Sequence, residues 1–210
     1  MEQRSPEWYA AKRGKVGTSS LNLVMAKGRA GAEATTRRNY RLQLACEILT
    51  GKTKESYQSG AMLAGAELEP LAKSHYEGRY GVMVEETFFQ DHPSIPGFGS
   101  SGDGLVGTDG GVEVKCTEVA AHIEVLQTGK IKREYHLQMQ GEMMCYQLQW
   151  VDFVSFNQDV PDAIQLEVIR VHPDLEMQKE ITRELLTFLG EVKNTVSSME
   201  KLIEDRSNEK

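Results

Sequence analysis

The spacing of apolar residues predicts helices in the first part of the chain and at its end. Apolar side chains recur there every three or four residues, which places them on one face of a helix. One of these helices contains Pro70, and proline is tolerated at a helix start but disrupts a helix interior. That helix is therefore expected either to begin at Pro70 or to kink there. The predicted helices cover residues 18–28, 35–50, 60–80 and 134–149, with a long terminal helix at about 174–204.

Shorter runs rich in β-branched and aromatic residues predict strands between these helices. The clearest pair surrounds a turn at Asp109-Gly110-Gly111, because Asp-Gly between alternating apolar runs is a strong hairpin signal. Residues 91–102 are rich in proline and glycine and are expected to form a loop. Helices on either side of a group of strands predict an α/β fold with a central mixed sheet flanked by helices. Further strands are expected over residues 82–89, 150–157 and 164–171.

Length and composition predict one ordinary globular domain covering residues 1–210. Hydrophobic residues make up 40% of the chain and charged residues 26%, which excludes a disordered or fibrous class. No apolar run approaches the roughly 20 residues that a membrane helix needs, so no membrane partner is expected. The polar N-terminus does not read as a secretory signal. The three cysteines are widely spaced, which argues against a zinc site and predicts a reducing, cytoplasmic location.

The charge is distributed unevenly along the chain. The formal net charge is −7, yet residues 1–41 hold nine basic and three acidic residues. A basic segment on an acidic body can form a local phosphate-binding face. Chance asymmetry on a solvated surface explains the same numbers, and charge alone does not separate the two interpretations.

The hairpin carries the candidate chemistry. Glu113 and Lys115 are two residues apart on its second strand, so both side chains point to one face, and Asp103 lies just before its first strand. Hard divalent cations such as Mg²⁺ prefer carboxylate oxygens, and a neighbouring ammonium can orient water or stabilise charge on a phosphate. These groups suffice in principle to hydrolyse a phosphodiester. A lone Glu-x-Lys is more often an ordinary pair on an exposed strand.

Taken in order, these residues resemble the active-site motif of the PD-(D/E)XK nuclease superfamily, and within it the lambda-exonuclease and YqaJ-type viral recombinase group. The resemblance covers roughly residues 5–156. One departure is Gly102, where the family usually has proline before the active-site aspartate. The motifs that carry the resemblance are Pro6-Glu7-Trp8, Lys12-Arg13-Gly14, Gly17-Thr18-Ser19-Ser20, Gly65 with Glu69, Ser101-Gly102-Asp103-Gly104, Glu113-Val114-Lys115-Cys116, and Tyr135 with Gln138 and Gln140.

The resemblance implies a restriction-endonuclease-like core and a metal-dependent deoxyribonuclease. Such enzymes degrade linear double-stranded DNA from 5′ to 3′ and leave 3′ single strands for a single-strand annealing protein in phage-type recombination. The implied cofactor is Mg²⁺, with Mn²⁺ as an alternative and two ions per site. Family members form homotrimer rings that enclose DNA. The expected origin is a phage or prophage whose protein acts in the bacterial cytoplasm.

The resemblance also assigns roles to residues. It implies that Asp103, Glu113 and the carbonyl of Val114 ligate metal, that Glu69 supports a second ion and that Lys115 acts on the nucleophilic water. Tyr135 and Gln138 would contribute polar groups from a helix. Their spacing puts them on one helical face with Glu142, although such a face is also typical of a solvated stripe.

A second set of residues is expected to bind the DNA end. Relatives use an arginine near the N-terminus for the 5′-terminal phosphate, and here Lys12 occupies its position and Arg13 follows, so either is a candidate. Ser19 and Ser101 match serines of the same phosphate pocket, although Ser19 also suits a helix cap. Met62 matches an apolar side chain that splits the terminal base pair, and a core methionine explains it equally well.

Two alternatives to an exonuclease remain at this stage: a non-catalytic DNA-end-binding module of the same fold, and a related endonuclease. The terminal helix has an apolar stripe that either packs on its own domain or binds a partner. Its members are Ile181, Leu185, Phe188, Leu189, Val192, Val196, Met199 and Ile203.

Overall fold

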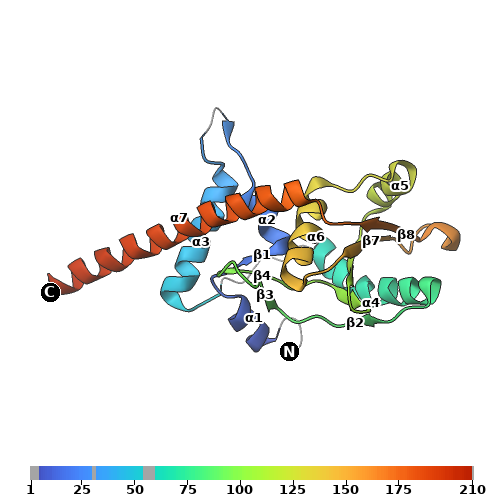
Figure 1. Ribbon diagram of the computed structural model, residues 1–210, viewed down its shortest axis with the longest axis horizontal. Helices are drawn as coiled ribbons and strands as arrows, with labels where there is room; N and C mark the ends of the chain where they lie inside the picture. Colours follow the sequence, from blue (N-terminus) through green and yellow to red (C-terminus); the bar gives the residue numbers. More distant parts are fainter. Residues whose placement is uncertain (1–4, 30–31, 54–59, 210) are drawn as a thin grey trace.

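A computed structural model describes residues 5–29, 32–53 and 60–209 (Figure 1). Its first part is mainly helical. Ser5 caps the first helix by accepting a hydrogen bond from Trp8 N, and Gly51 ends a later helix in the left-handed conformation. The helices here are α1 (Pro6–Lys12), α2 (Leu21–Val24), α3 (Thr35–Thr50) and α4 (Gly60–Tyr80), with a 3-10 turn η1 (Thr18–Ser20) before α2.

A five-stranded mixed sheet forms the centre of the described structure. β6 pairs antiparallel with β5 and parallel with β7, so the hairpin predicted from Asp103 to Lys115 is present. The strand order is β2-β5-β6-β7-β8. Their bounds are β2 (Val84–Glu85), β5 (Gly104–Val106), β6 (Gly110–Cys116), β7 (Trp150–Phe156) and β8 (Leu166–Val171).

Helices cover both faces of this sheet, which confirms the predicted α/β class. Tyr76 of α4 packs with Val112 and Val114 on one face. Met139 of α6 (Arg133–Tyr146) packs with Phe153 on the opposite face. Alternation along β6 therefore sends Val112 and Val114 to α4 and leaves the residues between them on the α6 side.

Two further helices complete the arrangement. α5 (Val119–Thr128) lies beyond the end of β6, where buried His122 bonds Ser155 of β7 at 2.7 Å. α7 (Leu175–Asn208) crosses α3 and α6, and its C-terminal end projects away from the other elements in Figure 1. Its predicted stripe is buried through Val196 except for the partly buried Leu189, whereas Met199 and Ile203 are exposed. Packing on its own chain thus accounts for most of the stripe.

A second, smaller sheet was not predicted. Its strands are β1 (Val16–Gly17), β4 (Phe98–Ser100) and β3 (Gln90–Asp91), in the order β1-β4-β3. β4 lies inside the segment 91–102 that was expected to be a loop. This sheet places the N-terminal segment beside Ser101, immediately before the hairpin.

The hairpin turn is two residues earlier than predicted. Gly107 takes a φ of +63° there, while Gly110 and Gly111 lie inside β6. A Cβ on Gly110 would come within 2.0 Å of the Trp150 ring. Glycine is therefore needed at this position because an indole packs against the strand, and not because the chain turns.

Other boundaries also differ from the predictions. α4 runs from Gly60 to Tyr80 with Pro70 inside it, so of the two alternatives, a helix start or a kink at Pro70, the start is wrong. Its buried side is formed by Ala72 and Tyr76. The strand expected over residues 82–89 is only the short β2, and the helix expected over residues 134–149 ends at Tyr146. The helix expected over residues 18–28 is the shorter pair η1 and α2.

Cys46, Cys116 and Cys145 are all free thiols. Of the helices that the structure describes, none combines the length and apolar character needed to cross a bilayer.

Candidate active site

The second strand of the hairpin brings an acid and a base to the α6 side of the sheet. Glu113 is fully buried there, and Lys115 Nζ forms an ion pair with its Oε1. Val112 and Val114 on the opposite face anchor the strand in the core. The predicted common direction of Glu113 and Lys115 is therefore present, and the pair is not an exposed surface contact.

Asp103 joins this pair through the backbone of the hairpin. Its Oδ2 accepts a hydrogen bond of 2.8 Å from Val114 N. The preceding residue is held on two sides, because the Thr87 hydroxyl donates to Gly102 O and Gly102 N donates to the Tyr146 hydroxyl at 3.2 Å. Glycine in place of the usual proline is thus accommodated by these contacts.

The charges around the hairpin are crowded. Burial, and then the charge on Glu113, raise the pKa of Asp103 well above its ordinary value. The same two causes raise the pKa of Glu142, a buried residue of α6. Burial lowers the pKa of Lys115, but the carboxylates of Glu113 and Asp103 outweigh it and raise the pKa overall. A cation bound among the carboxylates would relieve this repulsion.

The donor set suits a hard divalent cation. Within the described residues, Oε2 of Glu113 is buried without a hydrogen-bond partner, which leaves an oxygen available for an ion. Asp103 supplies a second carboxylate, and Mg²⁺ is commonly held by one or two carboxylates with water and substrate oxygens. Nowhere in the described chain do three or more His, Cys, Asp or Glu side chains group to hold a metal. Two carboxylates with water and substrate oxygens are a common donor set for Mg²⁺, and Asp103 and Glu113 fit that set.

Glu69 approaches the hairpin from the α4 face. Its Oε1 pairs with Lys73 Nζ at 2.6 Å, one helical turn away. Its negative charge also contributes to the raised pKa of Asp103 and of Cys116. α4 lies close to β6 here, since a Cβ on Gly65 would be 3.7 Å from Cys116 O.

The predicted face of α6 points at Lys115. Gln138 Oε1 lies 3.5 Å from Lys115 Nζ, and Gln138 Nε2 donates to Glu142 Oε1 at 3.1 Å. The Tyr135 ring centre is 5.1 Å from Lys115 Nζ, and the ring stacks on Phe153. These side chains are packed around the lysine, so the alternative of a solvated stripe is wrong. Glu142 was on this face in the sequence but had no assigned role.

Polar side chains that were expected to bind the 5′-terminal phosphate come together just before the hairpin, and this group of Lys12, Ser19 and Ser101 is named the Lys12 pocket. Trp8 Nε1 donates to Ser101 Oγ at 3.0 Å, and Lys12 Nζ is 4.6 Å from the Trp8 ring centre. A Cβ on Gly17 would meet Lys12 Cε at 3.2 Å and Ser19 Oγ at 3.9 Å. An ammonium and two hydroxyls thus converge, and Ser101 is only two residues from Asp103. Burial, partly offset by Glu47, lowers the pKa of Lys12.

Two predicted residues lie outside this pocket. Arg13 is exposed, and its Nε bonds Thr53 Oγ1 at 3.3 Å. The side chain of Met62 lies outside the described residues, although its backbone belongs to α4. Trp8 was recognised as part of a motif but not as a wall of the pocket. Its distance of 93 residues from Ser101 gave no sequence signal for that contact.

A family model described as the YqaJ-like viral recombinase domain matches residues 7–149, more than half of the chain. The chain belongs to this family. The YqaJ-like match ends within the turn after α6, so it includes every residue assigned above to the hairpin, to α6 and to the Lys12 pocket.

Solved structures agree with this membership. The YqaJ-like chain is 40% identical to the alkaline exonuclease LHK-Exo from Laribacter hongkongensis, with a TM-score of 0.88. The complex of that enzyme with dAMP gives a TM-score of 0.89, and each match covers 96% of this chain and 99% of the other. A phage related exonuclease from Haemophilus somnus is 18% identical over 88% of this chain and 96% of its own, with a TM-score of 0.68, which supports the fold alone. No match was found among curated proteins.

Proposed function

We propose that this YqaJ-like chain is a Mg²⁺-dependent 5′→3′ exonuclease that degrades linear double-stranded DNA and leaves 3′ single strands. The observation that carries the proposal is the meeting of Asp103, Glu113 and Lys115 on one hairpin, with an unpartnered buried oxygen on Glu113. Its similarity to an alkaline exonuclease over 96% of the chain supports the reaction class. Residues 1–210 act as one PD-(D/E)XK nuclease domain.

Each residue has a distinct task in this proposal. Asp103, Glu113 and the carbonyl of Val114 hold Mg²⁺, which Mn²⁺ can replace, and Glu69 supports a second ion. When bound, the metal would neutralise charge on the scissile phosphate and make a water more acidic. Lys115 holds the attacking water and donates to the phosphate oxygen that gains charge. Gln138 and Tyr135 keep the lysine ammonium in place.

The proposed direction of digestion follows from the Lys12 pocket. A terminal 5′-phosphate carries more charge than a bridging phosphodiester, and an ammonium with two hydroxyls is suited to bind it. Lys12, Ser19 and Ser101 provide these groups next to Asp103. Binding the 5′ end there would set the first phosphodiester at the carboxylates. Of the two candidate cations, the geometry favours Lys12, because Arg13 turns toward Thr53.

The proposal includes the partners that the family resemblance implies. Three copies would form a ring around DNA, so that the enzyme stays on its substrate, and a single-strand annealing protein would receive the 3′ strand. The protein would be phage or prophage encoded and act in the bacterial cytoplasm. Light scattering after size exclusion would test the ring, with a mass of one 23.5 kDa chain arguing against it.

The reaction is tested by a time course on linear duplex with a 5′-phosphate or a 5′-hydroxyl, in Mg²⁺ or EDTA. We expect mononucleotides from linear duplex in Mg²⁺, faster release from the 5′-phosphate, and none in EDTA. A circular duplex run in parallel identifies an endonuclease if it is cut. Binding of DNA ends without nucleotide release in Mg²⁺ or Mn²⁺ would instead indicate a non-catalytic end-binding module.

A further inference from the structure

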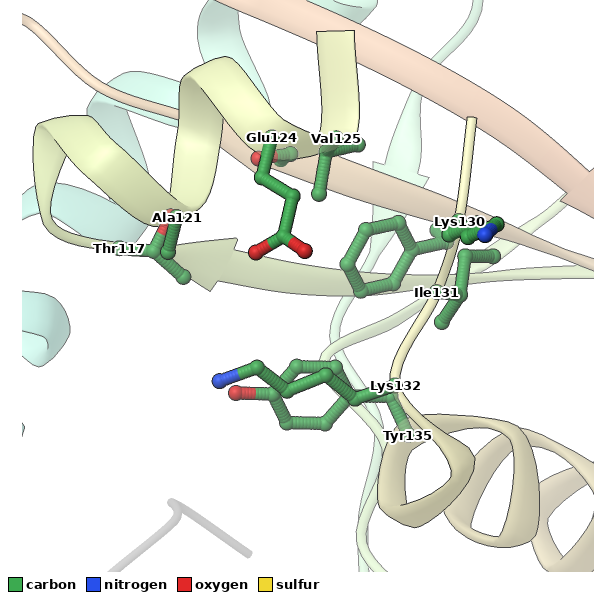
Figure 2. Close-up of a pocket in the computed structure, with 10 residues that line it drawn as sticks. Thr117, Ala121, Glu124, Val125, Lys130, Ile131, Lys132 and Tyr135 are labelled. Atoms are coloured by element: carbon green, nitrogen blue, oxygen red, sulfur yellow. The ribbon is translucent and has the colours of Figure 1, made fainter. Parts of the chain in front are cut away.

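A cavity of about 250 Å³ opens beside the active site, at the end of β6, where Thr117 directly follows the strand that carries Glu113 and Lys115. It lies between α5, the segment 130–132, the start of α6 and strand β7 (Figure 2). Its wall nearest the active site is Tyr135, whose ring also faces Lys115 Nζ at 5.1 Å. The cavity is therefore a direct continuation of the catalytic surface.

The lining of this cavity suits a flat, partly polar ring. Tyr135 and Phe153 form an aromatic wall with ring centres 5.7 Å apart, and Ala121 of α5 also lines the cavity. Drug-sized ligands occupy pockets of roughly 300 Å³ or more, so this volume suits a smaller group such as a single nucleobase. An aromatic wall stacks on any of the four bases because each presents a π-face.

The polar groups of the cavity match the edge and the backbone of a nucleotide. Within the described residues, Thr117 Oγ1 is buried without a hydrogen-bond partner. The Glu124 carboxylate points into the cavity, where it can accept from exocyclic amino groups (Figure 2). Lys132 extends alongside Tyr135, with Nζ 5.9 Å from the ring centre, and places a cation where a phosphate would pass.

The position of the cavity along α6 indicates which nucleotide it receives. Tyr146 at the C-terminal end of α6 bonds the backbone on both sides of Ser101, beside the Lys12 pocket. Gln138 lies between the two ends and faces Lys115. Tyr135 at the other end lines the cavity, about 16 Å from Tyr146 at 1.5 Å per residue. The Lys12 pocket, the carboxylates and the cavity thus follow one another along a single helix.

We propose that this cavity binds the unpaired base of the nucleotide on the 3′ side of the scissile phosphate, which becomes the new 5′ end after cleavage. The inference rests on the proposed exonuclease function and extends it, because it adds a base-binding subsite that stacks the second nucleotide on Tyr135. Holding that base out of the duplex aligns the phosphodiester between the first two nucleotides with Asp103 and Glu113.

The test compares single-turnover release of the first nucleotide from three 5′-phosphorylated duplexes. One is intact, one has a tetrahydrofuran abasic residue at the second nucleotide, and one has it in the complementary strand opposite that nucleotide. Both lesions remove the same base pair, but only the first removes the base that enters the cavity. We expect release to slow about tenfold for the first lesion, the order expected for one lost base stack, and not for the second.

Matched variants separate the cavity from general damage to α5. Ala121→Trp fills the cavity, whereas Ala120→Trp places the same side chain on the exposed side of the helix. On intact DNA, Ala121→Trp should release the first nucleotide about tenfold more slowly than the wild type. The abasic residue at the second nucleotide should slow this variant no further, because the base has already lost its site. Ala120→Trp should match the wild type on all three duplexes.

Several outcomes would overturn the inference. It fails if the wild type treats all three duplexes alike, or if Ala121→Trp behaves as Ala120→Trp does. Fluorescence anisotropy of the same duplexes in EDTA gives a second readout that needs no cleavage and no variant. A wild type that releases no nucleotide in Mg²⁺ refutes the proposed function, while the anisotropy still decides whether the base at the second position is bound.

Discussion

The amide of Gln138 is oriented so that its oxygen faces Lys115 Nζ at 3.5 Å. Its nitrogen donates to Glu142 Oε1 at 3.1 Å, which fixes that orientation. Lys115 is thus held from three directions, by Glu113 on its own strand, by Gln138 and by the Tyr135 ring. A lysine restrained in this way loses little freedom when it engages water and phosphate.

Replacing Lys115 by alanine should abolish cleavage and keep DNA binding. The substitution removes the group that, in the proposal, holds the attacking water and donates to the scissile phosphate, so we expect a loss of at least about a hundredfold in rate. Nucleotide release in Mg²⁺ and anisotropy of end-labelled duplex in EDTA measure the two effects separately. Lys179→Ala, on the exposed side of α7, is the control. Cleavage by Lys115→Ala at the wild-type rate would refute the assigned role.

The two adjacent cations near the N-terminus should differ in their effect on the 5′-phosphate. Lys12 sits between Trp8 and Ser19, whereas Arg13 is exposed. Lys12→Ala should bring the ratio of kcat/KM for 5′-phosphate over 5′-hydroxyl ends close to one. Arg13→Ala should leave that ratio unchanged, even if overall DNA affinity falls. The reverse result would assign the phosphate to Arg13.

The hairpin shows why part of this site could be predicted from the sequence. Alternation of Val112 and Val114 with Glu113 and Lys115 fixed the face of each side chain, because the strand repeat is two residues. Asp103 was placed just before the first strand of the hairpin, and the hydrogen bond from Val114 N to its carboxylate depends on hairpin pairing. Local pattern and pairing agreed here, so the prediction of the hairpin and its common face is confirmed.

Contacts between distant segments account for what could not be predicted. Ser101 meets Trp8 only because the small sheet places β1 against β4, and neither strand is long enough to give a periodic signal. The helices α1 and α5 were missed for the same reason, since each is short. Gly110 was read as a turn glycine, although packing of Trp150 explains it.

Mg²⁺ should stabilise the folded protein through Asp103. A ligand that binds only the native state adds about 2.7 kcal/mol at a hundred times its Kd, which raises Tm by about 5–10 °C for a chain of this size. Thermal unfolding with Mg²⁺ or EDTA measures the shift. Asp103→Asn should remove most of it, while Asp109→Asn, in the turn of the same hairpin, should keep it. An equal shift in both variants would place the ion elsewhere.

Removing the hydroxyl of Tyr76 should destabilise the protein without removing the catalytic groups. Tyr76 donates to Asp152 Oδ2 at 2.8 Å, and Asp152 is 2% exposed and also paired with Arg170. Since this bond joins α4 to β7 and its acceptor is charged, Tyr76→Phe should lower the free energy of unfolding by about 1.5–3 kcal/mol. Tyr80→Phe, on the same helix with Tyr80 47% exposed, should change it far less. Urea unfolding gives both values, and the rate of nucleotide release well below Tm should stay near the wild-type rate. An equal loss of unfolding free energy in the two variants would show that the Asp152 bond does not anchor α4. A collapse of activity in a fully folded Tyr76→Phe would instead mean that this anchor sets the position of Glu69.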